Sequence, residues 1–260
     1  MRAGITSQKT LFLGLSFFLI VLISCSSKQD DKLTIAVAAN LQFAIEDLVE
    51  KFSEQTGLEC EIIVGSSGKL TAQIIEGAPF DLFLSADLKY PKTLYERGFT
   101  EFEPDIYAHG NLILWTLRKD IEPDLESLTK KDVRHIAIGN PKTAPYGLSA
   151  MEVIKRLGIE ASIRNKLVFG ESVSQTNQFI ISEAADLGFT SKSVVMSPQM
   201  HNQGSWKEID KSLYQPMAQG MVILKAREAF RTKSIQFRDF ILSEEGKEIL
   251  HKFGYQIEFE

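Results

Sequence analysis

Five short junctions carry the residues in this chain that are best suited to chemistry. They are Ala39-Asn40, Ser66-Ser67, Ser85-Ala86, Ala144-Pro145-Tyr146-Gly147 and Ser172-Val173. Each one follows a strand-like run and precedes a helix-like run, and a helix N-terminus presents unpaired N–H groups with a partial positive charge. Taken singly, each junction is better explained as a helix cap or a surface turn. Taken together, they come from both halves of the chain and favour a site for a small anion.

The run Gly65-Ser66-Ser67-Gly68-Lys69 excludes two common alternatives and makes a third improbable. A P-loop needs four residues between its glycines and a Ser or Thr after the lysine, whereas here two residues intervene and Leu70 follows. A nucleophile elbow needs Gly-x-Ser-x-Gly. Ser66 and Lys69 match the Ser-x-x-Lys motif of penicillin-binding enzymes, but Lys142-Thr143-Ala144 lacks the glycine of the partner motif. We therefore expect a binding protein and not an enzyme.

Strand-like and helix-like runs alternate along the whole chain. Hydrophobic patterning predicts strands at residues 33–38, 59–64, 81–84, 111–117, 134–138, 167–169, 187–190 and 221–224. It predicts a first helix that begins after Asn40 and ends at Gly57, a second at 69–76 and a third that begins near Pro91 and ends at Gly98. Further helices are predicted at 147–157 and 173–185, and two more near the C-terminus. This order is typical of α/β architecture with mostly parallel sheets, in which ligands bind at the carboxyl ends of strands.

The N-terminus predicts export and lipid attachment. Arg2 and Lys9 precede an apolar run at 11–23, which is short for a membrane span and is typical of a secretory signal peptide. Leu22-Ile23-Ser24-Cys25, at the end of this run, resembles a bacterial lipobox. We predict a signal peptide at 1–24, lipidation of Cys25 and a tether at 25–32. An uncleaved signal anchor or an ordinary buried cysteine is the alternative.

Composition and residue spacing argue against nucleic-acid binding, a reactive cysteine and a metal or cofactor site. The net charge is −5 and basic residues form no cluster, so we expect no nucleic-acid partner. Cys60 is the only cysteine besides Cys25, and the alternating run around it predicts a packed strand residue. The four histidines are far apart in the sequence, so we expect neither direct metal-ion ligands nor a cofactor.

Several motifs resemble, in the same order, those of the molybdate-binding proteins of ABC transporters. Ala38-Ala39-Asn40-Leu41 resembles the opening motif of that family, and Gly77-Ala-Pro-Phe-Asp-Leu-Phe-Leu-Ser-Ala-Asp87 is the most specific match. The other matching runs are 65–70, 140–147, 187–189, 214–216 and 243–255. The resemblance covers the chain from Leu33 onward.

The resemblance implies a type II periplasmic binding fold. Such a fold has two α/β lobes with mixed, mostly parallel sheets flanked by helices, and two crossing hinge strands join the lobes. Residues 33–110 and 221–260 would form lobe 1, and residues 111–220 would form lobe 2. The crossing strands would fall near 111–117 and 219–224, and the anion would lie in the cleft.

The resemblance also implies the anion ligands. Asn40 would offer its N–H and its side-chain amide, Ser67 its hydroxyl and N–H, and Tyr146 and Val173 their backbone N–H groups. Ala39 is a weaker candidate, because it has no side-chain donor.

One family donor is missing from this sequence. Many relatives have a tyrosine hydroxyl in Gly-Ile-Val-Tyr, whereas this chain has Gly188-Phe189-Thr190-Ser191. Thr190 is the weaker candidate for a substitute, and Ser191 stays open as the alternative.

The chemistry of the family's ligands suits these residue types. Molybdate and tungstate are tetrahedral dianions without a proton near neutral pH, so they only accept hydrogen bonds. Neutral donors avoid the desolvation cost of a buried ion pair. We therefore expect Lys69 to stay away from the anion, and Asp81 and Asp87 to be a strand-end and a helix-cap residue. Sulfate, phosphate or a small organic anion is the alternative ligand.

These inferences predict a lipid-anchored solute-binding protein on the periplasmic or cell-surface face of a membrane. As a monomer, it would deliver molybdate or tungstate to the permease and ATPase subunits of an ABC importer. Its membrane contact would come through the lipid, and the membrane that holds this anchor stays open. A sensory or structural lipoprotein with the same fold is the remaining alternative.

Overall fold

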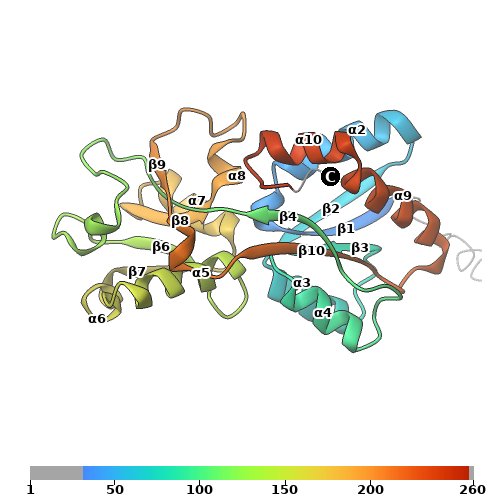
Figure 1. Cartoon of the computed structure of the whole chain (residues 1–260), viewed down its shortest axis with the longest axis horizontal. Coiled ribbons are helices and arrows are strands. Elements are labelled where there is room, and N and C mark those ends of the chain that lie inside the picture. The colour runs from blue at the N-terminus through green and yellow to red at the C-terminus, as the bar shows by residue number, and fades with distance from the viewer. Residues whose placement is uncertain (1–31, 258–260) are drawn as a thin grey trace, which may run out of the picture. The chain divides into compact units, whose positions relative to one another are not determined.

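Two five-stranded sheets form the framework of this protein in a computed structural model (Figure 1). The structure describes residues 32–257. The predicted signal peptide at 1–24, the predicted lipidation site Cys25 and the tether up to residue 31 lie outside the described residues. Within 32–257, the helices are all too short or too polar to cross a membrane.

The first sheet has the strand order β2-β1-β3-β10-β4, and we call this sheet with its helices lobe 1. Strand β1 pairs in parallel with β2 and β3, whereas β10 is antiparallel to β3 and β4. The strands are β1 (Leu33–Ala38), β2 (Cys60–Gly65), β3 (Leu82–Leu84), β4 (Asp105–Gly110) and β10 (Met217–Ile223). The helices are η2 (Ala39–Leu41), α2 (Ala44–Thr56), α3 (Ser67–Ile75), α4 (Lys89–Glu96), η6 (Glu228–Phe230), α9 (Arg231–Leu242) and α10 (Glu244–Lys252).

Helices cover both faces of the lobe 1 sheet, so its central strand is apolar on both sides. All six residues of β1 are buried. Ile35 and Val37 pack in the core under α2, α9 and α10, whereas Ala36 packs in the core under α3 and α4 (Figure 1). The apolar residues Leu41, Ile45, Leu48 and Phe52, whose spacing predicts one helix face, are buried, and Gly57 caps the end of α2 in a left-handed conformation.

The second sheet has the order β7-β6-β8-β5-β9, and we call this sheet with its helices lobe 2. Strand β6 is parallel to β7 and β8, and β5 is antiparallel to β8 and β9. The strands are β5 (Leu112–Thr116), β6 (Ile136–Gly139), β7 (Leu167–Gly170), β8 (Leu187–Ser191) and β9 (Ser205–Glu208). The helices are η3 (Leu125–Thr129), α5 (Pro145–Arg156), α6 (Glu160–Ile163), η4 (Arg164–Lys166), α7 (Val173–Ile181), α8 (Lys192–Val195) and η5 (Lys211–Leu213).

The chain passes between the two sheets twice. The first passage is at Asn111, between β4 and β5, and the second lies between η5 and β10 (Figure 1). The predicted boundary at residues 220 and 221 falls inside β10, because the backbone of Met217–Gly220 already pairs with β4. The segments predicted as crossing strands therefore each lie in one sheet: β5 in lobe 2 and β10 in lobe 1.

Two strands escaped prediction for a common reason. Strands β4 and β9 are edge strands, each with one neighbour in its sheet. All four residues of β9 are exposed, and β4 contains Asp105, His109 and Gly110. The edge strands β2 and β7 keep the aliphatic or aromatic runs 62–64 and 167–169, which marked them as strands, whereas charged and polar residues occupy much of β4 and β9 and hide the pattern. The helix predicted at 173–185 ends early, at Ile181.

Candidate anion-binding site

The four predicted ligand residues lie where a strand passes into a helix. Asn40 lies in η2 after β1, Ser67 begins α3 after β2, Tyr146 lies in the first turn of α5 after β6, and Val173 begins α7 after β7. Their exposed fractions are 1, 0, 1 and 5%. The first N–H groups of a helix have no partner within that helix, so these buried turns present donors with a partial positive charge.

Contacts between neighbouring residues bring these four positions together. The Gly68 N–H, next to Ser67, donates to the Thr143 carbonyl at 2.9 Å, three residues before Tyr146. The Ser174 hydroxyl, next to Val173, donates to the Gln42 side chain, two residues after Asn40.

The cores of the two lobes also merge at this place. Ala38, Ala39 and Ala86 from lobe 1 pack in the hydrophobic core of lobe 2. The structure therefore joins helix starts of both lobes in one cluster.

Ser67 is oriented as a hydrogen-bond donor. Its hydroxyl oxygen accepts the Ala86 N–H at 3.0 Å, and this leaves the hydroxyl hydrogen to donate elsewhere. Ala86 belongs to the Ser85-Ala86-Asp87 end of the most specific motif. The motif therefore orients a side chain that lies 19 residues earlier in the chain.

Helix α3 begins at Ser67, two residues before the predicted start at residue 69. Its N-cap is Ser66 and not Ser67, and the Ser66 hydroxyl is buried without a hydrogen-bond partner among the described residues.

Asn40 corrects two expectations. It is not the cap of α2, whose N-cap is Phe43. Its side-chain nitrogen donates to Gln219 Oε1 and to the Tyr255 hydroxyl, both at 2.9 Å. An amide nitrogen has two hydrogens, so no hydrogen remains for an anion. The backbone N–H in the first turn of η2 is the donor that Asn40 still offers, as it is for Ala39.

Thr190 does not offer the free hydroxyl that the sequence suggested. Its hydroxyl donates to Asn177 Oδ1 at 2.5 Å, and both side chains are buried. Asn177 Nδ2 is buried without a hydrogen-bond partner among the described residues. Asn177 lies one helical turn after Val173, and helical side chains lean toward the N-terminus. The pair therefore directs an amide donor toward the start of α7.

Tyr146 contributes more than the expected backbone N–H. Its hydroxyl accepts hydrogen bonds from Ser191 at 2.9 Å and from Gln219 Nε2 at 3.1 Å. Burial raises the pKa of Tyr146 well above its ordinary value, so the phenol is neutral. Ser191, the alternative candidate to Thr190, therefore directs its hydroxyl hydrogen to Tyr146 in α5.

A buried set of neutral side chains lies behind the cluster. We call it the hinge network because it lies where β4 and β10 lead into the passages between the lobes. Tyr107 donates to Gln219 Oε1 at 2.9 Å, Ser193 donates to the Asn40 carbonyl at 2.6 Å, and Tyr255 donates to the same carbonyl at 3.0 Å. The network consists of Asn40, Tyr107, Tyr146, Ser191, Ser193, Gln219 and Tyr255.

Sequence reasoning missed four of these residues and Asn177. Tyr107, Gln219 and Ser193 are separate polar residues outside the matching runs, and Tyr255 ends the run 243–255 without any sign of a role at the site. The only local signal was a polar side chain inside an apolar run, such as Gln219 in Met217–Ile223.

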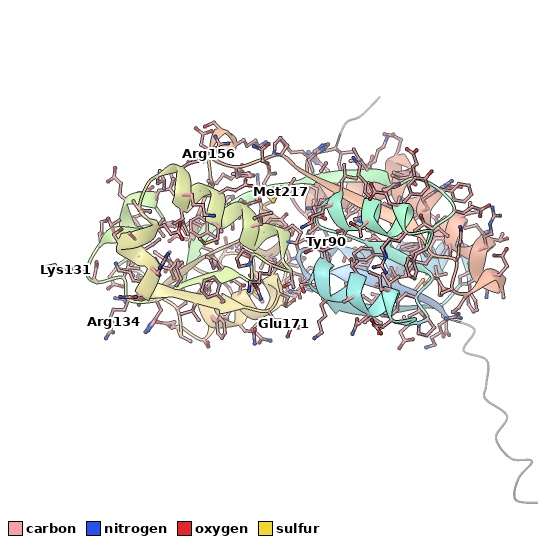
Figure 2. All side chains as sticks on the ribbon, turned by 90° about the horizontal axis from the view of Figure 1, so that it is seen from below. Tyr90, Lys131, Arg134, Arg156, Glu171 and Met217 are labelled. Atoms are coloured by element: carbon pink, nitrogen blue, oxygen red, sulfur yellow. The ribbon has the colours of Figure 1, made fainter. Side chains whose placement is uncertain are left out.

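A second set of contacts between the lobes is exposed to solvent. Lys69 forms an ion pair with Glu171 at 2.5 Å, and the Tyr90 hydroxyl donates to the Lys142 carbonyl at 3.1 Å. Figure 2 shows Tyr90 and Glu171 where the two halves adjoin. We call these two contacts, with the Gly68–Thr143 bond, the outer contacts.

Asp81 and Asp87, the two acidic residues of the most specific motif, have structural partners. The Asp87 carboxylate accepts the Tyr90 N–H at 3.3 Å at the start of α4, and Asp81 accepts the Thr34 N–H at 2.7 Å. Burial raises the pKa of both carboxyls. Within residues 32–257, the His, Cys, Asp and Glu side chains form no group of three or more that could hold a metal ion.

Comparison with known proteins identifies the family. The profile of the family described as "Bacterial extracellular solute-binding protein" matches residues 33–256. The molybdate-binding protein ModA of Rhodobacter capsulatus is 37% identical over 86% of this chain and 87% of its own length. A candidate substrate-binding lipoprotein of an ABC transporter from Bacillus subtilis, YvgL, is 26% identical over 94% of this chain and 96% of its own length.

A solved structure agrees with these sequence matches. The periplasmic molybdate-binding protein of Azotobacter vinelandii superposes with a TM-score of 0.83 at 33% identity, covering 88% of this chain and 100% of that protein. The predicted fold class, two mixed sheets flanked by helices as in periplasmic binding proteins, is confirmed, and so is the prediction that the chain is a binding protein and not an enzyme. The chain belongs to the bacterial extracellular solute-binding proteins, in the family of the ModA proteins.

Proposed function

We propose that this protein captures molybdate between its lobes and delivers it to an ABC importer. The observation that carries the proposal is the cluster of four buried helix starts from both lobes, with the neutral donor Ser67 among them. Two relatives that are named as molybdate-binding proteins, at 37% and 33% identity, support the choice of ligand. Tungstate has nearly the same size and charge, and we propose that it binds as well.

The proposed ligands are neutral donors. The backbone N–H groups of Asn40, Ser67, Tyr146 and Val173 face the anion, and the Ser67 hydroxyl adds a side-chain donor. A dianion without protons only accepts hydrogen bonds, and a hydrogen bond to a charged group contributes about 1.5–3 kcal/mol. Lys69 is engaged with Glu171 and takes no part.

We also propose that Asn177 supplies the donor that Thr190 was expected to supply. Its buried Nδ2 has no partner among the described residues, and the hydroxyl of Thr190 holds its oxygen. Asn177→Leu should therefore weaken molybdate binding. Thr190→Val should weaken it less, because it loosens the amide without removing the donor. A larger loss of molybdate affinity in Thr190→Val than in Asn177→Leu would instead make Thr190 the ligand.

Location and partners form the remaining part of the proposal. We propose that residues 1–24 are removed, that Cys25 carries lipid and that the monomer faces the periplasm or the cell surface beside the permease and ATPase subunits. The match to a lipoprotein of Bacillus subtilis supports the anchor. Metabolic labelling with a fatty acid tests it: label in the wild type and none in Cys25→Ser is expected, and label in neither protein would overturn it.

Calorimetric titration of the chain without residues 1–25 tests the ligand. The compact unit of the structure begins at Leu33, so this form keeps the whole fold. We expect one-to-one binding of molybdate and tungstate, with sulfate and phosphate weak. Tight sulfate or phosphate binding, or no molybdate binding, would overturn the proposal.

The same titration of two serine variants tests the place of the site. Ser67→Ala should weaken molybdate binding by about 1.5–3 kcal/mol. Ser234→Ala is the matched control, because it removes a buried hydroxyl in α9 whose partner is the carbonyl of Phe230, the last residue of η6. Equal affinities of the two variants would place the site elsewhere.

A further inference from the structure

Gln219 lies where the two lobes and the candidate site meet. Its side chain is 0% exposed, in β10 beside the second passage between the lobes. The pairing of β10 with β4 changes register between Gln219 and Gly220, as in a β-bulge. Bulges redirect side chains and recur beside functional sites.

The amide of Gln219 connects the two lobes by its two different ends. The oxygen accepts hydrogen bonds from Asn40 Nδ2 and from the Tyr107 hydroxyl, both in lobe 1. The nitrogen donates to the Tyr146 hydroxyl in lobe 2. One buried side chain therefore contacts two of the residues whose backbone N–H groups we assign to the anion, and these two residues belong to different lobes.

The contact depends on a glycine at the first passage between the lobes. A Cβ atom on Gly110 would overlap the Tyr146 hydroxyl and Gln219 Nε2. Gly110 is the last residue of β4, so the bridge lies between the two strands that lead into lobe 2. A change in the angle between the lobes would move Tyr146 relative to Gln219.

The amide of Gln219 matches the chemistry of its partners. The lobe 1 partners donate and the Tyr146 hydroxyl accepts, so the side chain needs an acceptor and a donor. A carboxylate would place a negative charge close to the proposed dianion. A leucine would leave one amide hydrogen of Asn40 buried without its acceptor, and Tyr107 would keep only the Ser85 carbonyl, at 3.0 Å.

We propose that Gln219 is a positioning residue that couples lobe closure to anion binding. It holds Asn40 and Tyr146 at the separation at which their N–H groups reach the same anion. The inference rests on the proposed function, because it gives these two N–H groups their ligand.

The pH dependence of molybdate affinity tests the inference in Gln219→Glu, which keeps the shape of the side chain. The wild type should bind with the same affinity from pH 6 to 9. The variant should lose affinity as pH rises, by about tenfold or more, because an ionising carboxyl then lies near the dianion. An affinity that equals the wild type's and stays constant with pH would overturn the proposal.

Gln219→Leu tests the bridge itself against a matched control. We expect an affinity loss of about tenfold, since both lobes lose a partner. Thr116→Val removes a different buried hydrogen bond, to the Asp186 carbonyl at the other end of β5, and should keep full affinity. Equal affinities of the two variants would count against the proposal.

A ligand-free measurement separates this inference from the proposed function. Spin labels on the exposed residues Glu50 in lobe 1 and Lys155 in lobe 2, with Cys60 replaced by Ser, report the distance between the lobes. Gln219→Leu and Gln219→Glu should broaden or shift the distance distribution, and Thr116→Val should not. If the wild type binds no oxyanion, the proposed function fails, and the distances still decide whether Gln219 sets the lobe angle. Unchanged distances in both Gln219 variants would overturn the coupling.

Discussion

The hinge network and the outer contacts join the same two lobes by different chemistry. The hinge network is neutral, and Asn40, Tyr146 and Gln219 in it are at most 1% exposed. The outer contacts include the ion pair of Lys69 and Glu171, whose side chains are 53% and 56% exposed. A buried polar group must keep its partner, whereas an exposed one exchanges its partner for water.

This difference indicates a division of roles. Contacts in the hinge network are expensive to break, so they set the geometry at which the lobes meet. An exposed ion pair contributes little to stability and is screened by salt. We therefore expect substitutions in the network to change stability and geometry, and substitutions in the outer contacts to change only the field that an arriving anion meets.

The largest effect is expected from Gly110→Ala. The added Cβ would overlap the Tyr146 hydroxyl and Gln219 Nε2, and relieving such overpacking costs about 3 kcal/mol. Gly77→Ala is the control, because Gly77 has open space around a Cβ but a left-handed φ of 92°, which costs about 1–2 kcal/mol. Denaturant titration of both variants measures the difference. Equal losses of unfolding free energy in the two variants would mean that the hinge network rearranges around the added methyl group at little cost. The hinge network would then not be the more expensive of the two regions to disturb.

Tyr146→Phe should have the next largest effect, and mainly on stability. The change removes the oxygen that accepts from Ser191 and from Gln219, and unpaired buried donors cost about 1–3 kcal/mol. Molybdate affinity should fall no further than in Gln219→Leu, because only the bridge to Gln219 is lost and the backbone N–H of Tyr146 that we assign to the anion remains. Denaturant titration and calorimetry on the same variant separate the two effects. Unchanged stability with a large loss of affinity would make the hydroxyl a ligand.

Hydrophobic patterning predicted the frame of the candidate site from the sequence. The apolar run of β1 and the stripe on α2 are local signals, and strand ends followed by helix starts lead to Asn40, Ser67, Tyr146 and Val173. These positions are predictable because the local sequence largely determines where each strand ends and where the next helix begins.

The partners of those residues could not be predicted in the same way. The two amide hydrogens of Asn40 are taken by residues 179 and 215 positions away, and their neighbours in the sequence give no sign of this. Thr190 was the weaker candidate to replace the missing family donor, but its hydrogen goes to Asn177, which lies in another element. A residue type and its spacing show what a side chain is able to donate, whereas only the packed structure shows where the hydrogen goes.

Alkaline pH should destabilise the hinge network more than the outer contacts. Burial raises the pKa values of Tyr107, Tyr146 and Tyr255 above the value of about 10 for an unfolded chain. The folded state therefore favours the neutral phenols. Their contribution is complete below about pH 10, and it is lost as pH rises through the folded values.

Two tyrosine variants measure this effect. The free energy of unfolding from pH 8 to 11.5 should fall less steeply for Tyr255→Phe than for the wild type. Tyr90→Phe is the comparison at the outer contacts, where burial also raises the pKa of a tyrosine, but the side chain is only half-buried. If the unfolding free energy fell with pH at the same slope in Tyr255→Phe and in Tyr90→Phe, the hinge network would be no more sensitive to alkaline pH than the outer contacts.

The smallest effects are expected at the ion pair of the outer contacts. Lys69→Gln and Glu171→Gln should each change the free energy of unfolding by less than about 1 kcal/mol. Their effects on the association rate of molybdate should have opposite signs, because one removes a positive and the other a negative charge beside an arriving dianion. Stopped-flow measurements at low salt should show both effects, and salt at about 1 M, where the Debye length is about 3 Å, should abolish them. If the pair instead acted as a latch on the closed lobes, both variants would release molybdate faster by the same factor.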